Sequence, residues 1–192
     1  MKDLPIPFNY YQMVLDSDHF HFGLWSDGMS EDSLEQAQER MFEVLFGYFP
    51  KPPATVLDIG CGLGKSAFFL ACQGYQVTAI SPSEELIEYA LKHYTHQNIA
   101  FHPIGFLESE QVLALQEYDV LFFQESLQYL HPLYKVFCQA RRFLKPKGMV
   151  IIGDEIRYDR QLQDHTAVHL WQDIQNAVLS NGFRLKIDQR VG

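Results

Sequence analysis

The stretch TVLDIGCGLG, from Thr55 to Gly64, decides the fold. Its first three residues are β-branched or apolar, which is typical of a buried strand, and three glycines at alternate positions follow. Glycine allows a sharp turn and a close approach of the backbone to a ligand. Residues 65–73 then continue as an apolar helix, whose N-terminus presents free N–H groups. The stretch therefore predicts a strand, a tight turn and a helix, which make half of a nucleotide-binding unit.

Strand and helix patterns alternate along the rest of the chain. We expect further strands at 76–80, 98–102, 118–123, 149–153 and 183–187, and further helices at 31–49, 82–94, 110–115, 132–144 and 166–180. This order predicts an α/β fold with a doubly wound, mostly parallel sheet and right-handed crossovers. In such sheets, ligands bind past the carboxyl ends of the strands, where the strand order reverses.

Length, charge and cysteine content narrow the class of protein. The 192 residues predict one domain, with an N-terminal lid and helix at 1–50 and a core at 51–192. A net charge of −9 argues against nucleic acid as the main partner. No apolar run reaches about 18 residues, so we expect no membrane span. The three cysteines form no C-x-x-C pair, which predicts reduced thiols and a cytoplasmic protein.

The spacing of the glycine turn resembles that of a known family. The pattern is G-x-G-x-G, and Asp58 stands two residues before the first glycine. Together these residues resemble the first motif of class I S-adenosylmethionine (SAM)-dependent methyltransferases, in a likeness that covers roughly residues 20–188. A carboxylate there suits a cationic ligand with an ammonium and a sulfonium, and suits a pyrophosphate poorly. The resemblance implies a Rossmann-like fold and SAM as the cofactor.

The resemblance also implies how SAM is held. The glycine turn would cradle its methionine part, while Asp58 would order the turn or receive the ammonium through water. The family usually has an acid after the second strand to hold the ribose, and Ser81 replaces it here; Ser81 and Ser83 could equally be helix caps. The predicted cofactor residues are Asp58, Gly60, Cys61, Gly62, Gly64, Ile80, Ser81, Phe106 and Gln124.

A second departure from the family concerns adenine. An Asp commonly stands near the position of Gly105 to take the adenine amine, and this chain has none. We therefore expect the base to lie between apolar side chains such as Ile80 and Phe106, with the backbone near Phe106 reading its edge. These two departures bear on the affinity for SAM rather than on the turn itself.

Polar residues after the fourth strand predict the acceptor side. The run Glu125-Ser126-Leu127 resembles the E-S-L stretch of small-molecule methyltransferases, although relatives often have a histidine where Tyr129 stands. Glu125 is a candidate base or a helix cap, and His131 follows nearby. Asp154, after the fifth strand, is another candidate base or substrate ligand, or else part of a solvated turn.

The sequence contains no complete metal-ligand motif. Catechol-type methyltransferases place a magnesium ligand where Asp154 stands, but the acidic D-N pair that completes their site is missing here. The eight histidines show no H-E-x-x-H spacing, and His93 and His96 make an H-x-x-H pair without the glutamate of that motif. We therefore expect no metal.

The segment HFHFGLW, from His19 to Trp25, crowds aromatic and histidine side chains next to a glycine. It is either an aromatic plug on the core or a lid over a ligand. Its likeness to the H-x-G-x-W stretch of small-molecule methyltransferases favours a lid. We expect His21 and Trp25 to line the acceptor pocket together with Gln128 and Tyr129.

The resulting hypothesis is methyl transfer from SAM to an oxygen or nitrogen of a small molecule. A carbon acceptor of terpenoid or sterol type is an alternative, because aromatic side chains and Glu125 could stabilise a cation. Two rivals are a non-catalytic SAM-binding scaffold and an NAD-dependent oxidoreductase. Nothing follows the predicted strand at 183–187 to complete a terminal hairpin, so the chain is truncated, a partner supplies the strand, or the substrate wall is reduced. An exposed sheet edge would favour a homo-oligomer.

Overall fold

The computed structural model describes residues 18, 21, 23–25, 33–158 and 168–186. Its centre is a five-stranded sheet with the order β3-β2-β1-β4-β5. The strands are β1 (Thr55–Ile59), β2 (Gln76–Ser81), β3 (Ile99–Pro103), β4 (Tyr118–Gln124) and β5 (Leu144–Gly153). Every neighbouring pair is parallel. The strand order reverses between β1 and β4, so the predicted doubly wound α/β fold is confirmed.

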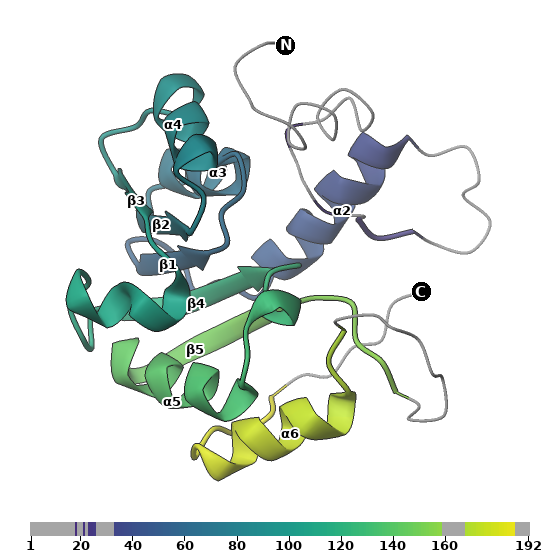
Figure 1. Cartoon of the computed structure of the whole chain (residues 1–192). Helices are drawn as coiled ribbons and strands as arrows, with labels where there is room; N and C mark the ends of the chain where they lie inside the picture. Colours follow the sequence, from purple (N-terminus) through teal and green to yellow (C-terminus); the bar gives the residue numbers. More distant parts are fainter. Residues whose placement is uncertain (1–17, 19–20, 22, 26–32, 159–167, 187–192) are drawn as a thin grey trace.

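Helices cover both faces of this sheet (Figure 1). One group comprises α2 (Leu34–Phe46), α3 (Lys65–Cys72) and α4 (Glu84–His93). The other comprises α5 (Leu133–Phe143), α6 (Trp171–Ser180) and the 3-10 turn η1 (Phe106–Gln111), and a second 3-10 turn, η2 (Leu127–Tyr129), follows β4. Figure 1 shows α5 and α6 along β4 and β5 on the side away from α3 and α4.

The two faces of the sheet carry separate hydrophobic clusters. In β4, Val120 and Phe122 belong to the cluster formed with α2, α3 and α4, whereas Leu121 and Phe123 belong to the cluster formed with α5 and α6. All four side chains are fully buried. A strand that is buried on both faces reads as a continuous apolar run, which explains why the sequence of β4 shows no alternation.

Helix α2 begins at Leu34, three residues later than the sequence predicts. Ser33 caps it in a capping box, in which Gln36 N–H donates to Ser33 Oγ (3.3 Å) and Ser33 N–H donates to Gln36 Oε1 (2.9 Å). Ser30, the residue that could cap a helix beginning at position 31, lies outside the described residues. The helix packs on the end of β5, where a Cβ on Gly153 would lie 2.5 Å from a methyl carbon of Leu45.

The predicted helix at 110–115 is wrong. The structure has the 3-10 turn η1 at Phe106–Gln111 instead. Phe106 is buried among core aromatic residues, and its carbonyl accepts hydrogen bonds from the Ser109 hydroxyl (2.6 Å) and from the Gln139 amide. The turn is therefore set by an aromatic anchor and side-chain bonds, which a periodicity argument does not detect.

The predicted strand at 183–187 is also wrong over its described residues, 183–186. Gly182 adopts a left-handed φ of +75°, and the N–H groups of Gly182 and Phe183 bond back to Leu179 (3.0 Å) and Val178 (3.2 Å). These bonds complete the C-terminus of α6. The ring of Phe183 then packs 6.0 Å from that of Phe137, so its hydrophobicity serves helix packing rather than a sheet.

Candidate active site

The glycine turn is tied to the carboxyl end of β2. The N–H groups of Gly60 and Cys61 both donate to the Ile80 carbonyl, at 2.9 and 3.1 Å. Gly60, Gly62 and Gly64 have φ values of +77°, +55° and +90°, a region that side-chain-bearing residues rarely adopt. Gly64 is the N-cap of α3, so the turn brings the free N–H groups of that helix to the edge of the sheet.

The three glycines differ in what surrounds them. A Cβ on Gly60 would lie 2.5 Å from Ser126 Cβ, and one on Gly64 would lie 2.9 Å from Ala90 Cβ. A Cβ on Gly62 would meet no atom of the described residues within 4 Å. Close packing therefore requires glycine at 60 and 64, whereas Gly62 borders open space that a ligand can occupy.

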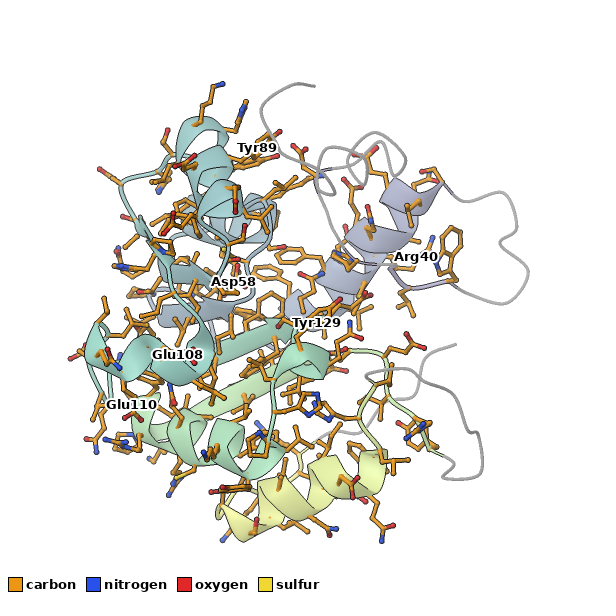
Figure 2. All side chains as sticks on the ribbon, viewed as in Figure 1. Arg40, Asp58, Tyr89, Glu108, Glu110 and Tyr129 are labelled. Carbon is orange, nitrogen blue, oxygen red and sulfur yellow. The ribbon has the colours of Figure 1, made fainter. Side chains whose placement is uncertain are left out.

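Asp58 is a buried residue of β1, two positions before the first glycine of this turn. It belongs to β1 rather than ending it, and it is 2% exposed (Figure 2). Among the described residues, its Oδ2 has no hydrogen-bond partner. Burial raises the pKa of Asp58 to about 7, and burial together with Asp58 raises the pKa of the Cys61 thiol. Buried polar atoms are normally paired, so this oxygen suits a cationic ligand group.

Ser81 and Ser83 shape the end of β2. Ser81 Oγ accepts the Ser83 N–H at 3.3 Å, and Ser83 Oγ accepts the Leu86 N–H at 3.3 Å as the N-cap of α4. Ser81 is therefore not the helix cap, and its hydroxyl proton stays available to a ligand. Ile80 and Phe106 are almost fully buried in the cluster shared with α5, and their contact with adenine stays a prediction.

A chain of side chains links α3, β4 and the N-terminal segment. The Ser66 hydroxyl donates to Gln124 Oε1 at 3.1 Å, and Gln124 Nε2 lies 2.8 Å from His21 Nε2. The Gln38 amide of α2 donates to the His21 carbonyl. His21 is buried at the end of β4, so two residues that the sequence predicts as separate acceptor and cofactor contacts, His21 and Gln124, bond to each other.

Glu125 directly follows β4 in a strained backbone conformation. Its φ is +46°, and its N–H donates to the Gly153 carbonyl at 2.7 Å. Its carboxylate Oε1 lies 4.0 Å from His21 Nδ1, and the two side chains are 10% and 6% exposed. Strained residues of this kind cluster at functional sites. Of the predicted catalytic residues, Glu125 is the one whose backbone geometry points to function.

Asp154 holds the turn that follows Glu125. Its Oδ2 accepts the N–H groups of Leu127 (2.8 Å) and Gln128 (3.3 Å), and its Oδ1 accepts the N–H of Glu155 (3.0 Å). These bonds lower the pKa of the Asp154 carboxyl, but burial outweighs them and raises that pKa to about 6. The carboxylate therefore anchors η2, and a role as base stays a prediction.

The remaining acceptor-side residues lie apart from one another. The His131 ring lies with its centroid 4.5 Å from that of His169, at an angle of 55° between the ring planes, and both rings line a shallow groove of about 510 Å³ between α5 and α6. Tyr129 (Figure 2) is 73% exposed and Trp25 is 43% exposed, so both side chains reach solvent. Gln128 Nε2 donates to the Glu125 carbonyl at 3.4 Å. His131 is thus grouped with His169, whereas His21 is grouped with Glu125.

The part of the chain that carries this geometry is similar to a known protein family. Residues 57–152, half of the chain, match the methyltransferase domain family. The chain belongs to this family. The match begins in β1 and ends in β5, so it contains the glycine turn and Glu125. The resemblance to class I SAM-dependent methyltransferases is therefore confirmed.

Individual relatives agree with this assignment. The domain is 32% identical over 143 residues to 27-O-demethylrifamycin SV methyltransferase of Amycolatopsis mediterranei, covering 71% of this chain and 51% of that protein. A putative sarcosine dimethylglycine methyltransferase from Galdieria sulphuraria has the same fold, with a TM-score of 0.76, 22% identity, and 91% and 73% of the two chains covered. So has the 4+2 cyclase SpnF, with a TM-score of 0.80, 18% identity, and 94% and 70% covered. The chain spans about half the length of the curated relatives it matches.

Sequence reasoning missed two partners in this methyltransferase domain. Ser66 orients Gln124, and His169 Nε2 lies 3.0 Å from the Leu127 carbonyl behind η2. Burial lowers the pKa of His169. Ser66 gives a weak signal as the second residue of α3, and a lone histidine before α6 gives none.

The described residues contain neither a metal-binding cluster nor a helix suited to cross a membrane. Within the ranges 33–158 and 168–186 and the five earlier described positions, no group of three His, Cys, Asp or Glu side chains is placed to hold a metal ion. None of the helices in this described part combines the length and the apolar composition that a bilayer crossing needs.

Proposed function

We propose that this domain is a SAM-dependent methyltransferase that methylates an oxygen atom of a small molecule. Two observations in the described residues carry the proposal: the open space at Gly62, and the buried Oδ2 of Asp58, two residues before the first turn glycine, which has no hydrogen-bond partner there. A buried carboxylate just before a glycine cradle suits a ligand with a positive charge. The relative that is named for 27-O-methylation supports an oxygen acceptor, and nitrogen is the alternative.

The residues present fit SAM. The main chain at Gly60 and Gly62 would hold the methionine part, and Asp58 would receive its ammonium. The Ser81 hydroxyl would give the ribose one hydrogen bond, and Ile80 and Phe106 would border the adenine. When bound, the sulfonium supplies an electrophilic methyl group with an excellent leaving group. The protein then has to align the acceptor, exclude water and accept a proton.

The acceptor would lie at the carboxyl ends of β4 and β5. Glu125 is the proposed base, because its carboxylate is mostly buried and its strained backbone is fixed by the bond to Gly153. Asp154 would act by holding η2, which carries Gln128 and Tyr129. Trp25 would close over the acceptor, and His131 would lie at the far side, towards α5.

The proposal extends to setting and assembly. Three free cysteines suit a reducing compartment, and we assign the domain to the cytoplasm. The net charge of −9 disfavours nucleic acid as the acceptor. Residues 1–50 would act as lid and first helix of a core that spans residues 51–192. β5 ends the strand order, and pairing of this edge with a second copy would appear as a dimer in size-exclusion chromatography.

Calorimetry with SAM, S-adenosylhomocysteine and NAD tests the cofactor, and transfer of a labelled methyl group from SAM to a panel of phenols, alcohols and amines tests the reaction. We expect micromolar binding of both sulfur ligands, no binding of NAD, and label in hydroxylated compounds. Binding of NAD without binding of SAM would overturn the proposal. SAM binding without label transfer to any compound class would favour a scaffold.

A further inference from the structure

We propose that His21 is a positioning residue for Glu125, an inference that rests on the proposed function. Ser66 and Gln124 fix the neutral His21 ring with its proton on Nδ1, and this N–H faces the Glu125 carboxylate. The dipole of the N–H group keeps Glu125 ionised and aimed at the acceptor hydroxyl. Residues from four places in the chain thus form one relay: α3, β4, the N-terminal segment and the position after β4.

The tautomer follows from the donors available. The Ser66 hydroxyl donates to Gln124 Oε1 at 3.1 Å, which turns the Gln124 NH₂ group towards His21. An amide nitrogen has hydrogens to give and no lone pair to receive one, so His21 Nε2 accepts this bond at 2.8 Å. A neutral imidazole that accepts at Nε2 carries its proton on Nδ1.

The Nδ1–H of His21 then faces Glu125. Nδ1 and Oε1 are 4.0 Å apart, which is too long for a hydrogen bond but short for a dipole facing a charge in a buried place. Both side chains are at most 10% exposed, so water screens the interaction weakly. A donor directed at a carboxylate favours its ionised form. The Gln38 amide holds the His21 carbonyl, so the ring cannot easily move away.

Charged groups on the packing elements are engaged with other partners. Lys65 of α3 lies 3.6 Å from Glu35 and 4.0 Å from Glu39, both on α2. The Arg40 guanidinium donates to the Leu24 carbonyl at 3.0 Å (Figure 2). Asp154 accepts main-chain N–H groups of η2. Against the Glu125 carboxylate, the structure places the His21 ring, with Nδ1 4.0 Å from Oε1.

The Glu125–His21 pair would serve the transfer of the methyl group from SAM to the acceptor oxygen. The acceptor oxygen forms a bond to the methyl carbon while the carbon–sulfur bond breaks, and the electron pair of that bond returns to sulfur. The hydroxyl proton moves to Glu125 and later to solvent. His21 keeps its own proton throughout, which distinguishes a positioning residue from a second base.

Nuclear magnetic resonance of the ¹⁵N-labelled protein reads the tautomer without any ligand. We expect the Nδ1–H form of His21 in the wild type. In Gln124→Glu the side chain has no N–H to donate, so the ring should shift to the Nε2–H or the doubly protonated form. Gln76→Glu adds the same charge at the exposed start of β2 and should leave the ring unchanged. An Nε2–H ring in the wild type, or no change in Gln124→Glu, would overturn the inference.

Kinetics separate positioning from folding. With labelled SAM and the hydroxylated compounds that accept label, His21→Phe should lower kcat about 30- to 100-fold with less than about a threefold change in SAM affinity. His21→Asn keeps a donor near the Nδ1 position and should recover at least about fivefold of that loss. His93→Asn, at the exposed end of α4, should behave as the wild type. Unchanged kcat in His21→Phe would overturn the inference, whereas failure of the wild type to bind SAM would overturn the proposed function alone.

Discussion

The hydroxyl of Ser126 donates a 2.6 Å hydrogen bond to the carbonyl of Ile59, which joins the carboxyl end of β4 to that of β1. The residue that follows β1 is Gly60, whose missing Cβ would lie 2.5 Å from Ser126 Cβ. The two strand ends therefore approach this closely because residue 60 has no side chain. This contact joins the glycine turn to the residues around Glu125.

Replacing Gly60 should break this fit. Gly60→Ala adds a Cβ at 2.5 Å and a side chain at φ +77°, so we expect the free energy of unfolding to fall by about 2–4 kcal/mol. Ser126→Gly removes the opposing Cβ and should recover part of this loss in the double variant. Urea unfolding of the four proteins gives the coupling, and strictly additive changes would show that the two side chains do not meet.

Replacing Gly62 should remove SAM binding while the fold persists. Gly62→Val puts a branched side chain into the open space, and its φ of +55° adds backbone strain of about 1–2 kcal/mol. Gly182→Val is a matched control, because Gly182 has a φ of +75° and also no atom within 4 Å of its Cβ. Calorimetry should show SAM binding in Gly182→Val and none in Gly62→Val. Equal affinities in the two variants would refute the cradle.

The buried Asp58 carboxyl should lower the free energy of unfolding at neutral pH, because ionisation is unfavourable in the folded state. Its folded pKa of about 7 lies above the ordinary value of 3.8, so the folded state disfavours ionisation. This penalty is absent below about pH 4, grows as the pH rises to about 7, and is constant above that. Asp58→Asn should therefore raise the free energy of unfolding at pH 8 by about 2–4 kcal/mol, and by much less at pH 5.

The same substitution should weaken SAM binding about tenfold or more, because the ammonium loses its charged partner. Urea unfolding at the two pH values and calorimetry at pH 8 measure both effects. A variant that is less stable than the wild type at pH 8 would mean that the carboxylate has a partner in the folded protein.

The positive φ of Glu125 predicts a difference in stability between two substitutions at this position. Glycine adopts a φ of +46° without penalty, so Glu125→Gly should be about 1 kcal/mol more stable than Glu125→Ala. Both variants should bind SAM and lose methyl transfer, since both lack the carboxylate. Thermal unfolding and label transfer test this pair. Full activity in either variant would end the assignment of Glu125 as the base.

Asp154 should stabilise the fold by holding the η2 turn, rather than act as a base. In Asp154→Asn the amide oxygen can accept both η2 N–H groups, but the amide NH₂ then faces the Glu155 N–H that Oδ1 accepts in the wild type, so unfolding should become about 1–2 kcal/mol easier. Glu88→Gln, at an exposed position of α4, is the control for loss of a carboxylate. A loss of methyl transfer with no loss of stability would restore Asp154 as a candidate base.

Local chemistry explains how much of the fold the sequence predicts. The glycine turn and the apolar run 120–123 of β4 depend on local residue types alone. The predictions at those two places are confirmed. The segment at 183–187 failed because Phe183 is a core residue of a helix end, and a short apolar run does not distinguish a strand from such an anchor. The η1 turn failed for a similar reason, since side-chain bonds to Phe106 set it.

The candidate site was predictable as a list of residues and not as a set of contacts. The sequence predicts Glu125 and His21 as separate candidates. They are 104 residues apart in the chain, and no local pattern shows that they approach each other at the end of β4. The sequence leaves Asp154 as either a base or a turn residue. The structure shows that one of its oxygens accepts the N–H groups of Leu127 and Gln128. Contacts between distant segments depend on packing, and no local pattern encodes them.

The strand order has a consequence for how this domain can change over evolution. Most residues proposed for the cofactor lie in or directly after β1 and β2, with Phe106 after β3 and Gln124 at the end of β4, whereas those proposed for the acceptor follow β4 and β5 or lie in the N-terminal segment. Away from the contacts that join the two sides, such as Ser126 with Gly60 and Gln124 with His21, substitutions on one side can therefore accumulate with little effect on the other. A lineage could acquire new substrates by exchanging the residues around η2 and α6 while its nucleotide cradle stays fixed, so a shared ancestry would predict the methyl donor better than the metabolite.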